Sequence, residues 1–221
     1  MTSLASSPPT VGILGAGSVG TAIARQALTA GLSVKIATAK PAEEIALLVE
    51  VVAPGAVAVD AAEAVSADLV VLAVPLPRYR TLDPELLAGK TVIDVMNHWA
   101  PTDGEIVEFE NDPRTSSEII QAFLHRSTVV KSLNHIGYHE LEEDDLPRGT
   151  PGRRGIALAG DEEHAVALVA EFLDRLDFDP VPAGPLAAGR AFQPRTEIFH
   201  GSHTAEELHT LLGTAAQLTH A

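Results

Sequence analysis

Short apolar runs alternate with segments of helical periodicity along most of the chain. The run at 69–74 (LVVLAV) is apolar throughout, which is typical of a parallel strand buried on both faces. Between the runs, apolar residues recur every three or four positions, as Val19, Ile23 and Ala27 do. The alternation predicts an α/β fold with a doubly wound, mainly parallel sheet.

The same pattern gives approximate bounds for the elements. We expect strands at residues 11–14, 32–37, 56–59, 69–74, 91–95, 128–133, 155–159 and 178–181. We expect helices from residue 18 to Gly31 and over 42–52, 61–65, 116–125, 162–176 and 204–218. The polar stretch 103–113 is predicted to be a loop or edge segment, and 148–154 (RGTPGRR) a flexible loop.

The first strand leads into a glycine-rich turn, Gly15-Ala16-Gly17-Ser18-Val19-Gly20. This is a G-x-G-x-x-G spacing between a strand and a helix, the context in which it predicts dinucleotide binding. Gly15 allows the tight turn, Gly17 lets a pyrophosphate approach the backbone, and Gly20 lets the helix pack on the strand. The helix N-terminus would face the phosphates with free N–H groups.

The end of the second strand bears on the choice of nucleotide. NAD-specific sites usually place a carboxylate there for the ribose 2′-hydroxyl. This chain has Thr38 and Lys40 instead, with no acid before Glu43. A hydroxyl and a cation suit a 2′-phosphate, so NADP(H) is the expected cofactor; a solvated surface charge is the alternative for Lys40.

Further candidate contacts follow the later strands. Val74, Pro75 and Leu76 lie at the carboxyl end of the fourth strand and Asn97 after the fifth, where ligands of such sheets bind. Asn134 and His135 follow the sixth strand and are the candidates for a catalytic contact. His135, His139 and Glu140 do not have a metal-site spacing on a helix, because Gly137 interrupts them, so no metal is expected.

The amino-acid composition excludes several classes of partner and of chemistry. The 221 residues carry a formal charge of −15, which argues against nucleic acid and anionic membranes as partners. The absence of cysteine excludes disulfides and thiolate chemistry. No apolar run has the length of a membrane span, and residues 1–9 read as a disordered lead-in, so we expect a cytoplasmic protein.

Several longer stretches resemble one family. They are GILGAGSVGTAIA from Gly12, LAVPLP from Leu72, KTVIDVMNHW from Lys90, VVKSLNHIGYHEL from Val129 and DPVPAGPLAAGR from Asp179. These resemble the NADPH-dependent reductases of the 5-deazaflavin F420 and related dinucleotide-binding oxidoreductases.

The resemblance implies a Rossmann-like sheet extended by C-terminal strands and a helical tail. It also implies NADPH in the glycine-rich cleft and a second ring, F420 or a flavin, stacked on the nicotinamide. By the same analogy, Thr38 contacts the 2′-phosphate, and Pro75, Asn97, Asn134 and the turn Ala183-Gly184-Pro185 line the cleft.

The chain departs from the family pattern at two places. Thr38-Ala39 replaces a typical Ser-Arg pair, so the family's arginine for the 2′-phosphate is missing, and Lys40 is one position further on. His135 stands within the family's Asn-Thr-Ile turn, and Trp99 and Tyr138 add bulk near the acceptor site. NADP dependence is less affected by these changes than the choice of F420.

Three functions remain open at this point. The first is hydride transfer between NADP(H) and a flat redox ring. The second is reduction of an imine or keto acid, which is indicated by Lys131 and Asn134, three positions apart. Such enzymes generally have a long helical C-terminal domain, and the tail of this chain is too short to form one. The third is an NADPH sensor or interaction module without turnover.

We expect one domain over 10–221, with a dinucleotide-binding core at 10–135 and an extension at 136–221 that forms part of the acceptor cleft. A homodimer is expected through the apolar tail around Phe192 and Phe199, and packing of this tail on its own domain is the alternative.

Overall fold

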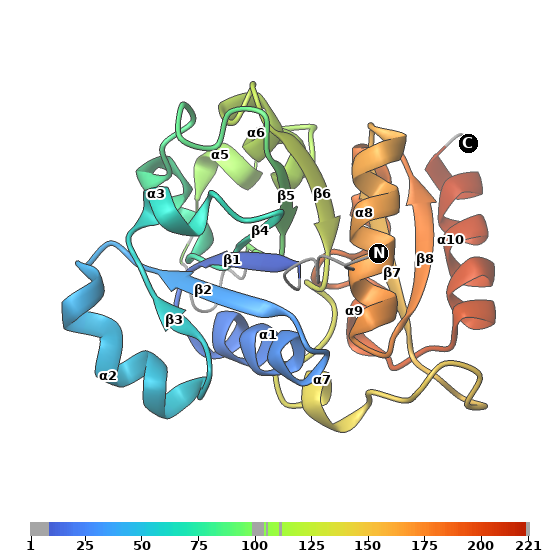
Figure 1. Cartoon of the computed structure of the whole chain (residues 1–221). Coiled ribbons are helices and arrows are strands. Elements are labelled where there is room, and N and C mark those ends of the chain that lie inside the picture. Colours follow the sequence, from blue (N-terminus) through green and yellow to red (C-terminus); the bar gives the residue numbers. More distant parts are fainter. Residues whose placement is uncertain (1–8, 99–103, 105, 111, 220–221) are drawn as a thin grey trace, which may run out of the picture.

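A computed structural model describes residues 9–98, 104, 106–110 and 112–219 of the chain. The expected lead-in at 1–9 and Trp99 therefore lie, apart from Pro9, outside the described residues. The centre of the fold is a single eight-stranded sheet with helices on both faces (Figure 1). The strands are β1 (Thr10–Leu14), β2 (Ser33–Ala37), β3 (Val57–Ala58), β4 (Leu69–Leu72), β5 (Thr91–Asp94), β6 (Thr128–Ser132), β7 (Gly155–Gly160) and β8 (Asp179–Gly184).

The strand order is β3-β2-β1-β4-β5-β6-β7-β8. The first six strands run parallel, β7 pairs antiparallel with β6, and β8 is again parallel to β7. This is the Rossmann order extended by two C-terminal strands. The predicted fold class is confirmed.

Helices and 3-10 helices connect the strands. They are α1 (Ser18–Thr29), α2 (Ala42–Val52), α3 (Ala61–Ala64), η1 (Leu76–Thr81), α5 (Val107–Glu110), α6 (Ser116–Phe123), α7 (Glu140–Glu143), α8 (Glu163–Arg175), η2 (Leu186–Phe192), α9 (Glu197–His200) and α10 (Ala205–Thr219). Helices α1, α2, α7 and α8 contribute to one apolar core, and α3, η1 and α6 to the core on the opposite face. A third cluster joins β7 and β8 to η2, α9 and α10, and α10 forms the right-hand edge in Figure 1.

Local sequence explains several element ends. Gly31 follows α1 with φ +76°, the left-handed conformation that ends helices at glycine. Helix α6 begins with a capping box, in which Thr115 and Glu118 bond each other's backbone N–H groups. Helix α2 has the predicted bounds, 42–52.

Two predictions about local structure are wrong. Residues 107–110 of the polar stretch form α5 rather than a loop. Arg153 and Arg154 end the supposed flexible loop, yet both are buried and bonded to carboxylates. Phe192 of the tail is fully buried against β7 and β8 of its own chain, which is one of the two arrangements expected for this tail.

A buried ion pair joins β5 to β6. Lys131 and Asp94 are both 0% exposed, with Lys131 Nζ 3.4 Å from Asp94 Oδ2. Lys131 also donates to the Met96 carbonyl, and Asp94 accepts hydrogen bonds from Ser117 Oγ (2.7 Å) and the Met96 amide (2.9 Å). Burial lowers the pKa of the Lys131 ammonium, and the nearby Asp94 carboxylate opposes that shift. The pair therefore holds the chain just after β5 against β6.

Replacing one partner of this pair should destabilise the fold strongly. We expect Asp94→Asn to lower the free energy of unfolding by about 3–5 kcal/mol, because it leaves a buried ammonium without its counter-charge. The measurement is urea denaturation followed by circular dichroism. Glu63→Gln is the matched control, since it breaks the Lys35–Glu63 pair, whose Glu63 side chain is 57% exposed; its expected cost is below about 1 kcal/mol. Equal costs for the two variants would contradict this role of Asp94.

Candidate functional site

The carboxyl ends of the six parallel strands lie along one edge of the sheet, and the strand order reverses between β1 and β4. In open α/β sheets, ligands bind outside this edge at the reversal point. The segments that leave these strand ends therefore form the candidate site.

The glycine-rich turn occupies the reversal point. Gly15 has φ +127°, and a Cβ there would lie 2.3 Å from the Ala73 carbonyl oxygen. A Cβ on Gly20 would lie 2.2 Å from the Gly15 carbonyl oxygen. Only glycine allows this packing of β1, α1 and the end of β4. At Gly17 the Cβ direction is open, with no atom within 4 Å, so space remains beside the backbone for a ligand.

Helix α1 starts with unpaired amides at this opening. The Thr21 amide donates to the Gly17 carbonyl at 3.0 Å, so the amides before it have no partner within the helix. Gly17 and Ser18 are exposed. No acidic side chain stands in the first turn, so the positive end of the helix is available to an anion.

The residues at the end of β2 form a short turn beside this opening. The Lys40 amide donates to Thr38 Oγ1 at 3.1 Å. The Lys40 side chain is 70% exposed and its ammonium lies 4.0 Å from Glu44. Thr38 and Lys40 are thus together at the end of the strand next to β1, where the adenosine half of a dinucleotide would lie.

The segment after β4 is divided between surface and core. Val74 is half-buried and Pro75 is exposed at the strand end. Leu76 is 2% exposed and packs in the core on the α3 and α6 face. Its side chain is therefore not available to a ligand, and of this predicted group only Val74 and Pro75 have side chains that solvent reaches.

Two asparagines link the ends of β5 and β6. Asn97 Nδ2 donates to the Asn134 carbonyl at 2.6 Å, and Asn134 Nδ2 donates to Asn97 Oδ1 at 3.0 Å and to the Phe192 carbonyl at 2.9 Å. Leu133 has φ 59°, a left-handed conformation that is strained for a leucine. This turn directs Asn134 back toward Asn97.

His135 is buried and fully engaged. Its Nε2 accepts a hydrogen bond from the Ala157 amide at 3.1 Å, so the neutral ring carries its proton on Nδ1, which lies 3.5 Å from Asn134 Oδ1. Burial, reinforced by the charges of Arg154 and Lys131, lowers the pKa of His135 to about 3. The geometry favours a positioning role for this ring over proton transfer.

A cavity of about 360 Å³ opens beside the asparagine pair. Val19 of α1 lines it together with Asn97, Asn134 and His135. It is completed by residues that sequence reasoning did not single out for this role: Val95, Leu133, Ile136, Gly137, Glu140, Arg154, Phe199, His200, Gly201 and Ser202. Tyr138, predicted near the acceptor, also lines it. Neither Lys131 nor the turn at 183–185 does so.

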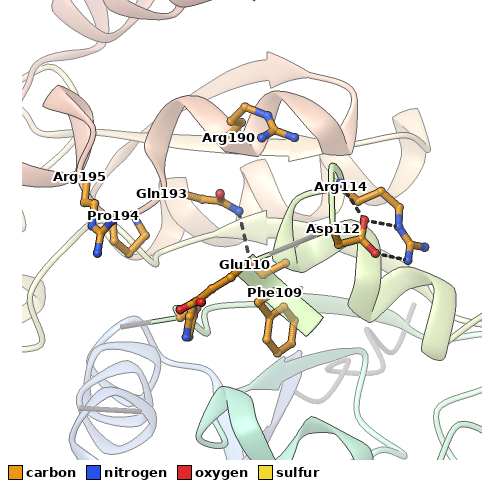
Figure 2. Close-up of a pocket in the computed structure, with 10 residues that line it drawn as sticks. Phe109, Glu110, Asp112, Arg114, Arg190, Gln193, Pro194 and Arg195 are labelled. Atoms are coloured by element: carbon orange, nitrogen blue, oxygen red, sulfur yellow. Dashed lines mark hydrogen bonds and ion pairs between the residues drawn. The ribbon is translucent and has the colours of Figure 1, made fainter. Parts of the chain in front are cut away.

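A larger hollow of about 450 Å³ lies between α5, α6 and the segment after η2 (Figure 2). Asp112 there is paired with Arg114 at 2.7 Å, and hydrogen bonds from the Arg114 side chain and backbone lower the pKa of Asp112 to about 2. Arg190 donates to the Pro113 carbonyl at 2.5 Å. No residue of the glycine-rich turn lines this hollow, so we assign the chemistry to the smaller cavity.

Neither a metal site nor a membrane-spanning helix is present in the described residues. These residues contain no group of three or more His, Cys, Asp or Glu side chains arranged to hold a metal ion. No helix in the same part of the chain is both long and apolar enough to cross a membrane.

Comparison with known proteins agrees with this geometry. Residues 10–98 match the model of a family described as NADP oxidoreductase, coenzyme F420-dependent. The resemblance predicted from the sequence is confirmed. The matched segment runs from β1 to Asn97 and His98, so it includes the glycine-rich turn and the ends of β2, β4 and β5. The chain has no significant match among curated proteins.

Solved structures share the whole fold. A hypothetical protein of Sinorhizobium meliloti is 25% identical, with a TM-score of 0.73 over 89% of this chain and 95% of that one. A proposed F420-dependent NADP reductase of an Arthrobacter species is 23% identical, with a TM-score of 0.68 over 96% and 93%. A reductive aminase of Aspergillus terreus in complex with NADPH is 18% identical, with a TM-score of 0.54 over 97% of this chain but only 63% of its own length.

The open space at Gly17 gives a direct test of the nucleotide site. Gly17→Trp should abolish NADPH binding, measured by isothermal titration, because the indole would fill the position of the phosphates. The melting temperature should change little, since the Cβ direction is free. Gly213→Trp is the control, because Gly213 on α10 is equally open but remote from the turn. Undiminished binding by Gly17→Trp would contradict the placement.

Proposed function

We propose that this protein is an oxidoreductase that transfers a hydride between NADP(H) and a flat redox-active ring, F420 or a flavin. The observation that carries the proposal is the cavity of about 360 Å³, whose wall includes both Val19 from the glycine-rich turn and the Asn97–Asn134 pair. A nucleotide held by the turn would extend toward this cavity, and a second ring there would meet its nicotinamide.

The residues present suit NADP(H). Free amides at the start of α1 and the open direction at Gly17 support binding of the pyrophosphate through Gly15, Ala16, Gly17, Ser18, Val19 and Gly20. Thr38 and Lys40 would contact the 2′-phosphate at the end of β2. Val74 and Pro75 would border the bound nucleotide between its adenosine half and its nicotinamide half. Similarity to NADP oxidoreductases over residues 10–98 supports the same choice.

The bound nucleotide would supply the hydride, and the chain's own groups would set orientation. Asn97 and Asn134 fix each other's side-chain amides and are anchored to the Phe192 carbonyl. A pre-oriented pair of this kind holds a ring without reorganisation, which is how proteins accelerate hydride transfer between cofactors. His135 holds Asn134 and the β7 backbone in place.

The two groups that the sequence offered for acid–base chemistry, His135 and Lys131, are unsuited to it, which favours this reaction over reduction of an imine or keto acid. His135 is held neutral. Lys131, which the sequence offered for the alternative, is fully buried between Asp94 and the Met96 carbonyl and lines neither hollow. The fold likeness to a reductive aminase keeps imine reduction as the second candidate, and an NADPH sensor as the third.

We further propose that residues 10–135 bind the nucleotide and that residues 136–221 complete the acceptor cleft, through Glu140, Arg154 and His200. A homodimer and a cytoplasmic location stay predictions. The exposed large apolar side chains of the described residues lie on α2, at β3 and after β6 rather than around Phe192; they are Leu47, Leu48, Val51, Val57 and Tyr138.

The proposal is tested by mixing the protein anaerobically with oxidised F420 and either NADPH or NADH. We expect rapid loss of the deazaflavin absorbance with NADPH and slower loss with NADH. Lys40→Ala should raise the KM for NADPH about tenfold, the value of one charge-assisted contact, and leave the KM for NADH unchanged. Arg148→Ala, which removes another exposed cation, is the control.

Other results would contradict separate parts of the proposal. Equal rates with NADPH and NADH would show that Thr38 and Lys40 do not select for the 2′-phosphate. Tight NADPH binding with no oxidation by F420 or flavins would overturn the proposed acceptor. Oxidation by cyclic imines would then support the second candidate, and absence of all turnover the third.

A further inference from the structure

Arg154 is a buried cation on the wall of the acceptor cavity. Its side chain is 4% exposed, and its Nη1 donates to Glu140 Oε2 at 2.7 Å and to Asp144. Its backbone is fixed by a bridge to Thr204 and by a hydrogen bond from the Asp179 amide to its carbonyl. The guanidinium is therefore held in one place.

Two of its nitrogens are left for a ligand. Nε and Nη2 make no hydrogen bond to any residue that the structure describes. Among the described residues, no side-chain nitrogen or oxygen that is sealed from solvent lacks a hydrogen-bond partner. Arg154 Nε and Nη2 are therefore not sealed from solvent, and Arg154 lines the cavity, so we infer that these N–H groups are reached from it.

Glu140 provides an acceptor next to these donors. Its Oε2 accepts from Arg154 Nη1 and from the Gly137 amide, at 3.2 Å, whereas its Oε1 accepts no hydrogen bond within the described residues. Burial raises the pKa of this carboxyl, but the hydrogen bonds from Arg154 and Gly137 outweigh it and hold the pKa below its ordinary value. Glu140 is thus ionised and lines the cavity beside Arg154.

We propose that Arg154 and Glu140 together recognise a ring edge that carries a carbonyl oxygen next to an N–H group, as in a cyclic imide or lactam. Arg154 donates to the carbonyl and Glu140 Oε1 accepts from the N–H. This inference rests on the proposed function and deepens it, because it selects acceptors with a pyrimidinedione-type edge, which flavin and deazaflavin rings have.

The local charge argues against a carboxylate in this place. Glu140 and Asp144 both face the one guanidinium, so the cluster has an excess of one negative charge before any ligand binds. A second anion beside Glu140 would be repelled. A neutral edge that both donates and accepts satisfies the two free groups without adding charge.

The test compares two rings that differ only at the N–H group, 5-deazariboflavin and its N3-methyl derivative. Binding is measured by fluorescence titration with saturating NADP+. Wild-type protein should bind the N–H form about tenfold or more tightly than the methylated form, because methylation removes the bond to an ionised acceptor. Glu140→Ala should bind both rings with similar affinity.

Asp144→Ala is the matched control. Asp144 also pairs with Arg154 Nη1 but does not line the cavity, so this variant should keep the preference for the N–H form. Melting temperatures show whether both variants fold. Equal loss of the preference in both variants would overturn the proposal, because Glu140 would then act only through Arg154.

Two further outcomes separate this inference from the proposed function. If wild-type protein oxidises NADPH with a deazaflavin but binds both rings equally, the edge recognition is wrong and hydride transfer stands. If it binds NADP+ but neither ring, both the acceptor and the edge recognition are overturned.

Discussion

The close packing of backbone at the reversal of strand order is the constraint on which the site depends. β1, the first turn of α1 and the end of β4 meet so closely that a Cβ at Gly15 or Gly20 would overlap a carbonyl oxygen. Because of this contact, α1 begins directly at the edge of the sheet, with its unpaired amides facing outward. The open space at Gly17 follows from the same arrangement.

The other half of the site is held by polar groups rather than by close packing. Lys131 and Asp94 join the ends of β5 and β6 inside the protein, and Asn97 and Asn134 join them at the edge. The left-handed Leu133 carries a strain of about 1–3 kcal/mol, which these bonds must offset. The cavity wall at the asparagines is therefore held in one arrangement by these hydrogen bonds.

The sequence predicted the parts of the fold that depend on local pattern. Local patterns of a few residues were enough to predict three features: the apolar run of β4, the periodicity of α2 and the glycine spacing of the turn. Parts that depend on distant partners were missed. Arg153 and Arg154 look like loop residues in RGTPGRR, and only the folded chain brings Asp174, Asp179, Glu140 and Asp144 to them.

The candidate site shows the same division. The glycine turn, Thr38, Lys40, Asn97 and Asn134 could be predicted as candidates because each follows a recognisable strand. Glu140, Arg154 and His200 were not assigned to the cavity, since they come from a short helix, the start of β7 and α9. Leu76 was predicted for the wall of the cleft and Lys131 was considered for imine reduction, yet both side chains are buried, because a sequence pattern does not show which way a side chain faces.

We propose that the chain passes a hydride directly from nicotinamide to a second ring. The most direct measurement is a single anaerobic turnover with NADPH deuterated at C4 of the nicotinamide and oxidised F420, followed by mass spectrometry of the reduced deazaflavin. We expect one deuterium at carbon 5 of the ring and a slower transfer than with unlabelled NADPH. The label is placed in turn at each of the two hydrogens on C4. Direct hydride transfer would be contradicted by reduced deazaflavin that carries no deuterium from either labelled form, or by the absence of reduction while NADPH binds tightly.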